Sequence, residues 1–148
     1  LDGVYKLAEI NGQPVIKLSE SSQKVTLPGK KQVYRIADSA GQWLGAEAVT
    51  LRDEQDPTII YDPFDQTRSL PIQNCRKEPL LSSVMEEGKR TNRPDSLEGI
   101  AAFCAQQLQR LPVEYKRFGN PHEYKVGMGS ELNEMRNNLI AQHKQGAR

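Results

Sequence analysis

The residues with the clearest chemical potential form a basic cluster near the start of the chain. The side chains that suit phosphate there are Lys17, Ser19, Lys24, Lys30 and Lys31. They flank a predicted strand and the Pro28-Gly29 turn, and a turn presents backbone N–H groups to an anion. Neighbouring ammonium groups strengthen such a site, so this pattern predicts phosphate binding. A solvated lysine-rich loop is the alternative interpretation, because runs of charge commonly lie on exposed faces.

Charge is divided unevenly along the chain, although the formal net charge is only +1. The first 37 residues carry six basic and three acidic side chains. In residues 38–65, Arg52 is the one basic residue against seven acidic ones: Asp38, Glu47, Asp53, Glu54, Asp56, Asp62 and Asp65. One stretch therefore favours anions and the next repels them. The acidic spacing matches no calcium loop, so the pattern indicates soluble loops.

The sequence predicts no catalytic residue and no metal or bound cofactor in this chain. Two histidines and two cysteines are few for a metal site. A nucleophile pair of Cys75 or Cys104 with His122 is a second interpretation, but no local signature supports it. There is no Walker loop, GxGxxG or GxSxG motif. Both thiols are predicted to be free, with Cys104 buried on an apolar helix face.

Composition also bears on partners and compartment. A basic and aromatic patch follows the first predicted main helix: Arg110, Tyr115, Lys116, Arg117 and Phe118. Nucleic-acid binding uses such residues, but the near-neutral charge and the acidic middle argue against a nucleic-acid partner. No apolar run reaches the length of a membrane span, and no signal-peptide pattern is visible. We expect no membrane partner and a cytoplasmic location.

Strands are predicted first along the chain, at residues 4–10, 14–18, 33–37, 43–51, 58–61, 67–72 and 122–126. Asn11-Gly12 predicts a type I′ hairpin turn, because both of its central residues need a positive φ. Gly45 inside the fourth strand predicts a bulge. Residues 80–87 are predicted as a short helix that ends at Gly88.

Two main helices are predicted after the strands. The first begins at Asp95 as N-cap and ends before Pro112. Its apolar stripe is predicted to be core, so that Leu108→Ala costs about 2–5 kcal/mol; the stripe comprises Leu97, Ile100, Ala101, Cys104, Leu108 and Leu111. The second begins at Ser130 and carries Leu132, Met135, Leu139 and Ile140 on its apolar face. The predicted class is α+β, with antiparallel hairpins followed by two main helices.

Two segments of the chain resemble the C-terminal part of nicotinate phosphoribosyltransferases. The first is GVYKL at 3–7, IKLSE at 16–20 and KVTLPGKKQVYR at 24–35. The second is Arg117, NPHEYKV at 120–126 and SEL at 130–132, followed by an amphipathic helix. Asp2 and the 127–129 stretch depart from the family pattern. The chain begins without Met inside a predicted strand, so we expect a fragment of a larger enzyme.

The resemblance implies a fold and an activity. Residues 1–37 would be a basic hairpin segment adjoining an upstream barrel, and residues 38–148 an α+β C-terminal domain. The family makes nicotinate mononucleotide from nicotinate and phosphoribosyl pyrophosphate with ATP hydrolysis, in NAD biosynthesis. It uses ATP and Mg as co-substrates and forms a homodimer. Its catalytic histidine and main phosphate loops precede this chain, so we expect no activity from the chain alone. The alternative is a non-catalytic α+β module for subunit contacts or anion binding.

Overall fold

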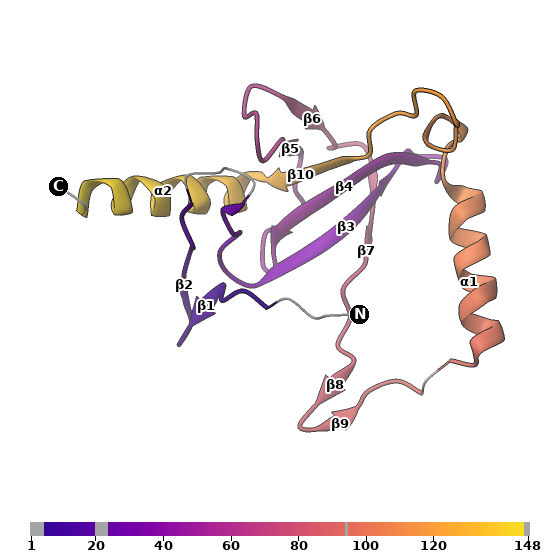
Figure 1. The fold of residues 1–148 in the computed structure, drawn as a ribbon, viewed down its shortest axis with the longest axis horizontal. Helices are drawn as coiled ribbons and strands as arrows, with labels where there is room; N and C mark the ends of the chain where they lie inside the picture. The colour runs from indigo at the N-terminus through magenta and orange to yellow at the C-terminus, as the bar shows by residue number, and fades with distance from the viewer. Residues whose placement is uncertain (1–4, 20–23, 94, 147–148) are drawn as a thin grey trace.

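A six-stranded sheet forms the centre of the computed structural model, which describes residues 5–19, 24–93 and 95–146. The strand order is β6-β5-β10-β4-β3-β7 (Figure 1). β10 runs parallel to β4, and the other neighbours are antiparallel. The strands are β3 (Lys31–Ala37), β4 (Trp43–Leu51), β5 (Ile59–Tyr61), β6 (Ser69–Pro71), β7 (Arg76–Pro79) and β10 (Lys125–Gly129).

The β3–β4 hairpin carries the predicted bulge. Arg35 pairs with Glu47, whereas Ala37 pairs with Trp43, so two steps along β3 span four steps along β4. Gly45 lies in this irregular stretch with φ of +61°. Glycine adopts that backbone without the strain a Cβ would bring. The prediction of a bulge at Gly45 is confirmed.

The hydrophobic core lies on the sheet between β3, β4 and β5. It consists of Ile36, Ala46, Ala48, Ile60 and Ile72, which are all buried. Ala46 and Ala48 of β4 are fully buried, so the larger isoleucines of the cluster pack against a strand that presents small side chains. The sheet is held together by this cluster and by β10, which inserts between β4 and β5.

The last helix, α2 (Ser130–Gly146), follows β10 directly and extends away from the sheet (Figure 1). Leu132 is fully buried, and the Met135 sulfur lies near Gly29. At its N-terminus the buried Glu54 carboxylate accepts hydrogen bonds from the backbone N–H groups of Glu131 and Leu51, both at 3.2 Å. A carboxylate there stabilises the positive end of the helix. Glu54 therefore joins the β4 end to α2, although the sequence indicated a soluble loop.

The N-terminal segment forms a short hairpin of β1 (Glu9–Ile10) and β2 (Gln13–Pro14). Asn11 and Gly12 have φ of 49° and 78°, so the predicted turn is confirmed. The strands are shorter than predicted, and residue 4 of the first predicted strand lies outside the described residues. The Ala8 carbonyl accepts backbone hydrogen bonds from the N–H groups of Val15 and Gly29, at 2.9 and 2.8 Å, and these bonds hold the segment in place.

The predicted helix over residues 80–87 is wrong. After β7 the chain forms a hairpin of β8 (Met85–Glu86) and β9 (Lys89–Arg90). Glu87 and Gly88 both have a positive φ, 49° and 75°, which is the backbone of a tight hairpin turn. The sequence predicts that Gly88 ends a helix, whereas in the structure Gly88 completes this hairpin turn.

The first main helix is α1 (Leu97–Arg110), and its N-cap is Ser96 rather than Asp95. The Ser96 hydroxyl accepts a hydrogen bond from the Gly99 N–H at 3.1 Å. None of its residues is buried: Leu97 is 78% exposed and Leu108 57%. The prediction that its apolar stripe is core is wrong for this structure, and Cys104 is exposed as well. Both cysteines are free, as predicted.

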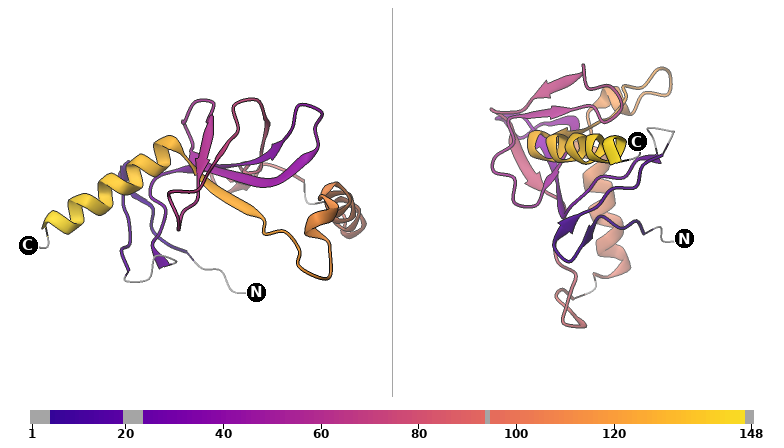
Figure 2. Two further views of the ribbon diagram at one scale, coloured as in Figure 1. Left: turned by 90° about the horizontal axis from the view of Figure 1, so that it is seen from above. Right: turned by 90° about the vertical axis from the view of Figure 1, so that its left-hand side faces the viewer.

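Figure 2 shows why this stripe meets no core: α1 stands at the end of the molecule opposite to α2, beyond the sheet. Strands that form hairpins and two main helices nevertheless confirm the predicted α+β class. No helix among the described residues is long and apolar enough to cross a membrane.

The exposure of Leu108 reverses the expected effect of its truncation in the 148-residue chain. We expect Leu108→Ala to change the free energy of unfolding by only a few tenths of a kcal/mol, because exposed substitutions have small effects. Urea melts of wild type and variant measure this. A loss of about 2–5 kcal/mol would show that Leu108 is buried in the isolated chain.

Candidate functional site

The basic segment places two of its predicted phosphate ligands in internal contacts. The Lys31 ammonium donates hydrogen bonds to the Leu27 carbonyl at 2.9 Å, to the Pro28 carbonyl at 3.4 Å and to the Gly29 carbonyl. Burial lowers the pKa of Lys31, and Glu9 opposes that shift. Lys31 therefore closes the Pro-Gly turn. Lys30 is exposed and forms an ion pair with Glu9 at 3.1 Å.

The other predicted ligands lie on the loop that follows β2. Lys17 and Lys24 are exposed, and Ser19 is half-buried. The Lys17 backbone N–H donates to the Thr26 hydroxyl at 2.9 Å, and this bond brings the two sides of the loop together. Nearby, a hollow of about 280 Å³ is lined by Lys6, Ala8, Val25, Thr26, Leu27 and Lys31. Lys6 and Lys31 both line this hollow, which their spacing in the sequence did not indicate.

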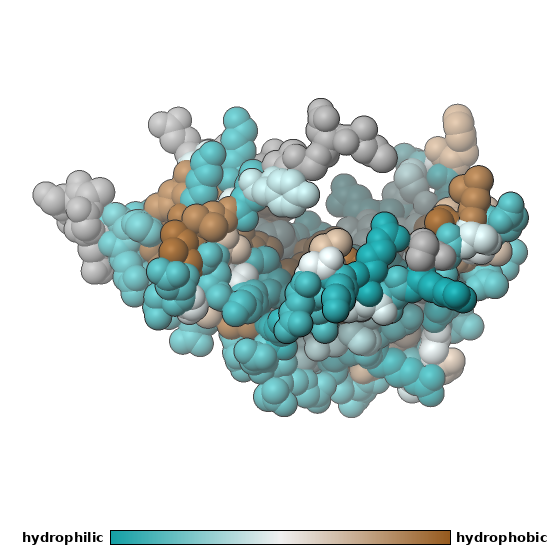
Figure 3. All heavy atoms as spheres, turned by 90° about the horizontal axis from the view of Figure 1, so that it is seen from below, coloured by the Kyte–Doolittle hydropathy of each residue, from teal (hydrophilic) through white to brown (hydrophobic). Residues whose placement is uncertain are grey.

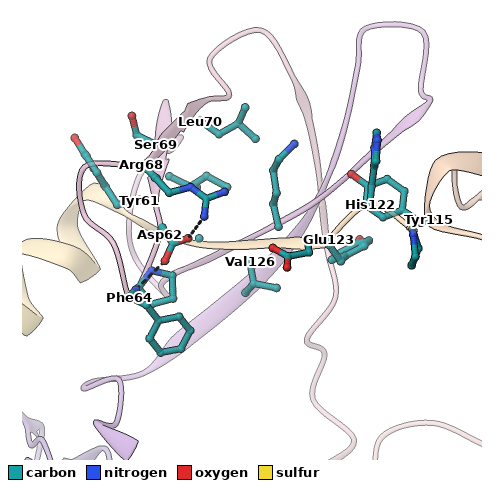
Figure 4. Close-up of a pocket in the computed structure, with 16 residues that line it drawn as sticks. Tyr61, Asp62, Phe64, Arg68, Ser69, Leu70, Tyr115, His122, Glu123 and Val126 are labelled. Carbon is teal, nitrogen blue, oxygen red and sulfur yellow. Dashed lines mark hydrogen bonds and ion pairs between the residues drawn. The ribbon is translucent and has the colours of Figure 1, made fainter. Parts of the chain in front are cut away.

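A larger cleft of about 870 Å³ lies elsewhere, between the β5–β6 hairpin and the chain that enters β10. Figure 4 shows Tyr61, Phe64 and Leu70 on the hairpin side, and Val126 and Glu123 on the chain that enters β10. The lining is mostly apolar, which is typical of sites for small molecules or peptide side chains. A side chain at Gly127 would meet Ile60 at 2.7 Å, so the glycine lets the two walls converge at the cleft floor.

The cleft has a polar wall and an aromatic wall. Arg68 lies 3.8 Å from the Asp62 carboxylate, which also accepts the Phe64 N–H at 2.8 Å (Figure 4). At the other end Tyr115 packs edge-on against His122 and Tyr124, with ring centroids 5.8 and 5.6 Å apart. This combination can hold an apolar group beside a charged one. The sequence indicated only the Asp62-Pro63 break and not the cleft itself, because the residues of the two cleft walls are distant in the chain.

Tyr115 and Trp43 anchor α1 to the sheet. The Tyr115 hydroxyl donates to the Leu44 carbonyl at 3.2 Å, and its ring lies where a Gly45 side chain would point. The guanidinium groups of Arg35 and Arg110 each lie over the Trp43 ring, 4.4 and 4.3 Å from its centroid. Such cation–π contacts strengthen when they are partly desolvated.

Arg35 links this anchor to the sheet. It donates to the Glu47 carboxylate at 2.9 Å and to the Gln107 side-chain oxygen at 3.0 Å. Burial by itself would lower the pKa of Arg35, but the hydrogen bonds and charges of Glu47 and Tyr124 together outweigh burial and raise it. Tyr124 donates to the same carboxylate at 3.4 Å, and burial followed by Glu47 raises its pKa. These groups position α1 and present no nucleophile with an adjacent base.

No cluster of three metal-ligating side chains occurs within residues 5–19, 24–93 and 95–146. Sequence similarity to known proteins identifies the family of the chain. Residues 30–136 match the family described as the nicotinate phosphoribosyltransferase C-terminal domain. The chain belongs to this family. The match includes the sheet, the cleft and α1, so the resemblance inferred from the sequence is confirmed.

Individual relatives agree with the family. A nicotinate phosphoribosyltransferase of Dictyostelium discoideum is 35% identical over 147 residues, which cover 92% of this chain and 25% of the relative. The human and Bacillus subtilis (strain 168) proteins of the same name are 32% and 30% identical, over 95% and 88% of this chain. The crystal structure of human nicotinic acid phosphoribosyltransferase matches with a TM-score of 0.73 and 29% identity. It covers 93% of this chain, which spans 26% of the human protein.

Proposed function

We propose that this chain is the C-terminal part of a nicotinate phosphoribosyltransferase. The whole enzyme makes nicotinate mononucleotide from nicotinate and phosphoribosyl pyrophosphate with ATP hydrolysis, a step of NAD biosynthesis. The observation that carries the proposal is the agreement of sequence and fold over more than nine-tenths of the chain, together with the family match over residues 30–136. The chain spans about a quarter of these relatives, so the activity is a property of the longer enzyme.

The chain's own residues contribute structure to that enzyme and no catalytic group. We infer that the reacting groups and the Mg–ATP co-substrate are held by the remaining three quarters of the enzyme. Displacement at the ribose anomeric carbon depends on positioning a polyanion and stabilising the departing pyrophosphate. The proposal includes a cytoplasmic homodimer with no nucleic-acid or membrane partner, the setting in which a soluble metabolic enzyme works.

A direct assay tests this function. The longer protein that contains this chain is expected to convert nicotinate and phosphoribosyl pyrophosphate into nicotinate mononucleotide, with a rate that rises when Mg–ATP is added. The 148-residue chain at the same concentration is expected to give no product above the buffer blank. Turnover by the short chain, or no turnover by a folded longer protein, would contradict the proposal.

Phosphate binding by the lysine cluster is a finer part of the proposal. Lys17, Lys24 and Lys30 are exposed, so their ammonium groups can attract a polyanion at long range. Ser19 adds a hydroxyl on the same loop. Lys31 supports the turn through its carbonyl contacts, and its removal would disturb the loop itself. Lys24 and Lys30 are therefore the residues to test.

We expect Lys24→Gln/Lys30→Gln to raise the KM for phosphoribosyl pyrophosphate or ATP several-fold more than the KM for nicotinate. The difference should shrink as salt rises, because screening acts over about 8–10 Å. Steady-state kinetics at low and high salt measure it. Lys144→Gln, an exposed lysine near the end of α2, is the matched control. Equal KM values for variant and wild type at low salt would leave Lys17 with Ser19 as the remaining candidates.

A further inference from the structure

One long stretch of the chain has no fully buried residue among those the structure describes, although Cys75 packs against the core from a half-buried position. Ile72 is fully buried and Gly127 is buried, but none of the described residues between them is. This stretch, residues 73–126, is here called the arm; it contains β7, the β8–β9 hairpin and α1. Figure 1 shows the hairpin and α1 reaching away from the sheet. Ordering each residue costs roughly 1–2 kcal/mol of backbone entropy, so an arm without a core needs a surface to cover it.

The composition of α1 is that of a buried helix. Its charged residues are Glu98 and Arg110, one near each end, and residues 99–109 carry no charge. Ile100 is 52% exposed and Phe103 61%. Helices that face solvent carry charged residues on the exposed side, whereas depletion of charge is typical of interface cores. Figure 3 shows apolar surface at the end of the molecule where Figure 1 places α1.

Small residues would let another surface approach α1 closely. Gly99, Ala101, Ala102 and Ala105 lie among the larger apolar side chains. Ridges and grooves of this kind suit packing against another helix or a sheet. The anchor around Trp43 holds the C-terminal end of α1, through Arg110 and Gln107. The structure thus fixes the direction of α1 and leaves its apolar stripe free to pack.

The size of the relatives indicates what covers α1. About three quarters of the human and Dictyostelium proteins lies outside the matched region. A surface in the same polypeptide is always present at high effective concentration. An uncharged apolar stripe is also poorly suited to repeated exposure, since large exposed apolar patches promote association. These points favour a permanent intramolecular contact over a transient partner.

We propose that the apolar stripe of α1 packs against the rest of the same enzyme polypeptide, outside residues 1–148. This inference rests on the proposed function, because it requires the longer enzyme. The arm then contacts two surfaces: Trp43 and Tyr115 join it to the sheet, and α1 packs against the rest of the enzyme. The occupant is a complementary apolar surface of that body; a second copy of this chain is the competing occupant.

Cys104 provides a test in the wild-type protein, because it lies on the stripe and is exposed in this chain. Alkylation of Cys104, followed peptide by peptide with mass spectrometry, is compared between the 148-residue chain and the longer enzyme. We expect the rate to fall at least about tenfold in the longer enzyme, since modification then requires local opening. Equal rates in the two proteins would overturn the proposal.

Two variants of α1 separate docking from folding. Leu108→Asp places a charge on the stripe, and Gln106→Asp places the same group on the opposite face of the helix. In the longer enzyme Leu108→Asp should restore fast alkylation of Cys104, and Gln106→Asp should leave it slow. In the 148-residue chain neither variant should shift the urea midpoint beyond the change expected for Asp in a helix. Slow alkylation in the Leu108→Asp enzyme would overturn the proposal.

The competing occupant and the proposed function have separate readouts. If the 148-residue chain forms a dimer in sedimentation and Cys104 becomes protected as the concentration rises, a second copy covers α1 and the proposal fails. Nicotinate mononucleotide formation is measured on the same longer enzyme. If Cys104 is protected but the enzyme forms no nicotinate mononucleotide, the docking proposal stands and the proposed function fails. If the enzyme is active but Cys104 is alkylated fast, the proposed function stands and the docking proposal fails.

Discussion

Gly129→Ala is expected to be among the most destabilising substitutions in this chain. A methyl group at position 129 would overlap the Glu54 carboxylate, which is buried beside the end of β10. Moving that carboxylate breaks its hydrogen bonds to the N–H groups of Leu51 and Glu131. Loss of bonds to a charged group costs about 1.5–3 kcal/mol, and overpacking adds about 1–3. We expect a total of about 3–6 kcal/mol.

Urea unfolding of the 148-residue chain measures this loss. Gly119→Ala is the matched control, because a Cβ at position 119 meets nothing within 4 Å. A second variant, Glu54→Ala, removes the carboxylate that a Cβ at position 129 would meet, and with it the hydrogen bond at the α2 N-terminus. The double variant Gly129→Ala/Glu54→Ala should be little worse than Glu54→Ala alone, as coupled neighbours are non-additive. Additive losses, or a Gly129→Ala loss equal to that of the control, would contradict this account.

Gly45→Ala is expected to have the second large effect, and it acts on the arm. Gly45 has φ of +61°, a left-handed backbone that costs alanine about 1–2 kcal/mol. Its Cβ would also occupy the place of the Tyr115 ring. The ring must then leave Tyr124 and His122 and give up the bond to the Leu44 carbonyl. We expect a loss of about 2–3 kcal/mol, from the strain and from the lost aromatic contacts.

The matched control for Gly45→Ala is Gly88→Ala. Gly88 has a similar φ, +75°, but open space around it. The difference in unfolding free energy between the two variants therefore isolates the displacement of Tyr115. Hydrogen exchange should also rise in α1 for Gly45→Ala and stay unchanged for Gly88→Ala, because Tyr115 holds the chain that leaves α1. Equal losses in both variants would show that Tyr115 anchors nothing.

Local patterns predicted much of the fold. Asn11-Gly12, the β3–β4 hairpin and the bulge at Gly45 follow from turn chemistry within a few residues, and they were found as expected. The insertion of β10 between β4 and β5 depends on contacts between residues far apart in sequence, so no local pattern indicates it. The helix predicted over residues 80–87 failed because helix and hairpin compete for the same glycine at position 88.

The position of the α1 stripe shows a different limit. Helical periodicity predicts that a face is covered, and it cannot identify the covering surface. The stripe is exposed in this chain, and a cover from the rest of the enzyme is our proposal for it. For the basic segment, composition indicated the sign of the charge. It could not indicate that Lys31 turns inward to carbonyls of its own loop while Lys30 pairs with Glu9.

Growth of cells that depend on nicotinate for NAD tests the central claim most directly. The claim is that this chain acts only as the C-terminal part of a nicotinate phosphoribosyltransferase. In cells that lack their own enzyme, with nicotinate as sole NAD precursor, the longer gene should restore growth. The 148-residue chain, expressed at a level verified by immunoblot, should not. Growth of cells that express the short chain, or failure to grow in cells that express the longer gene well, would contradict the account.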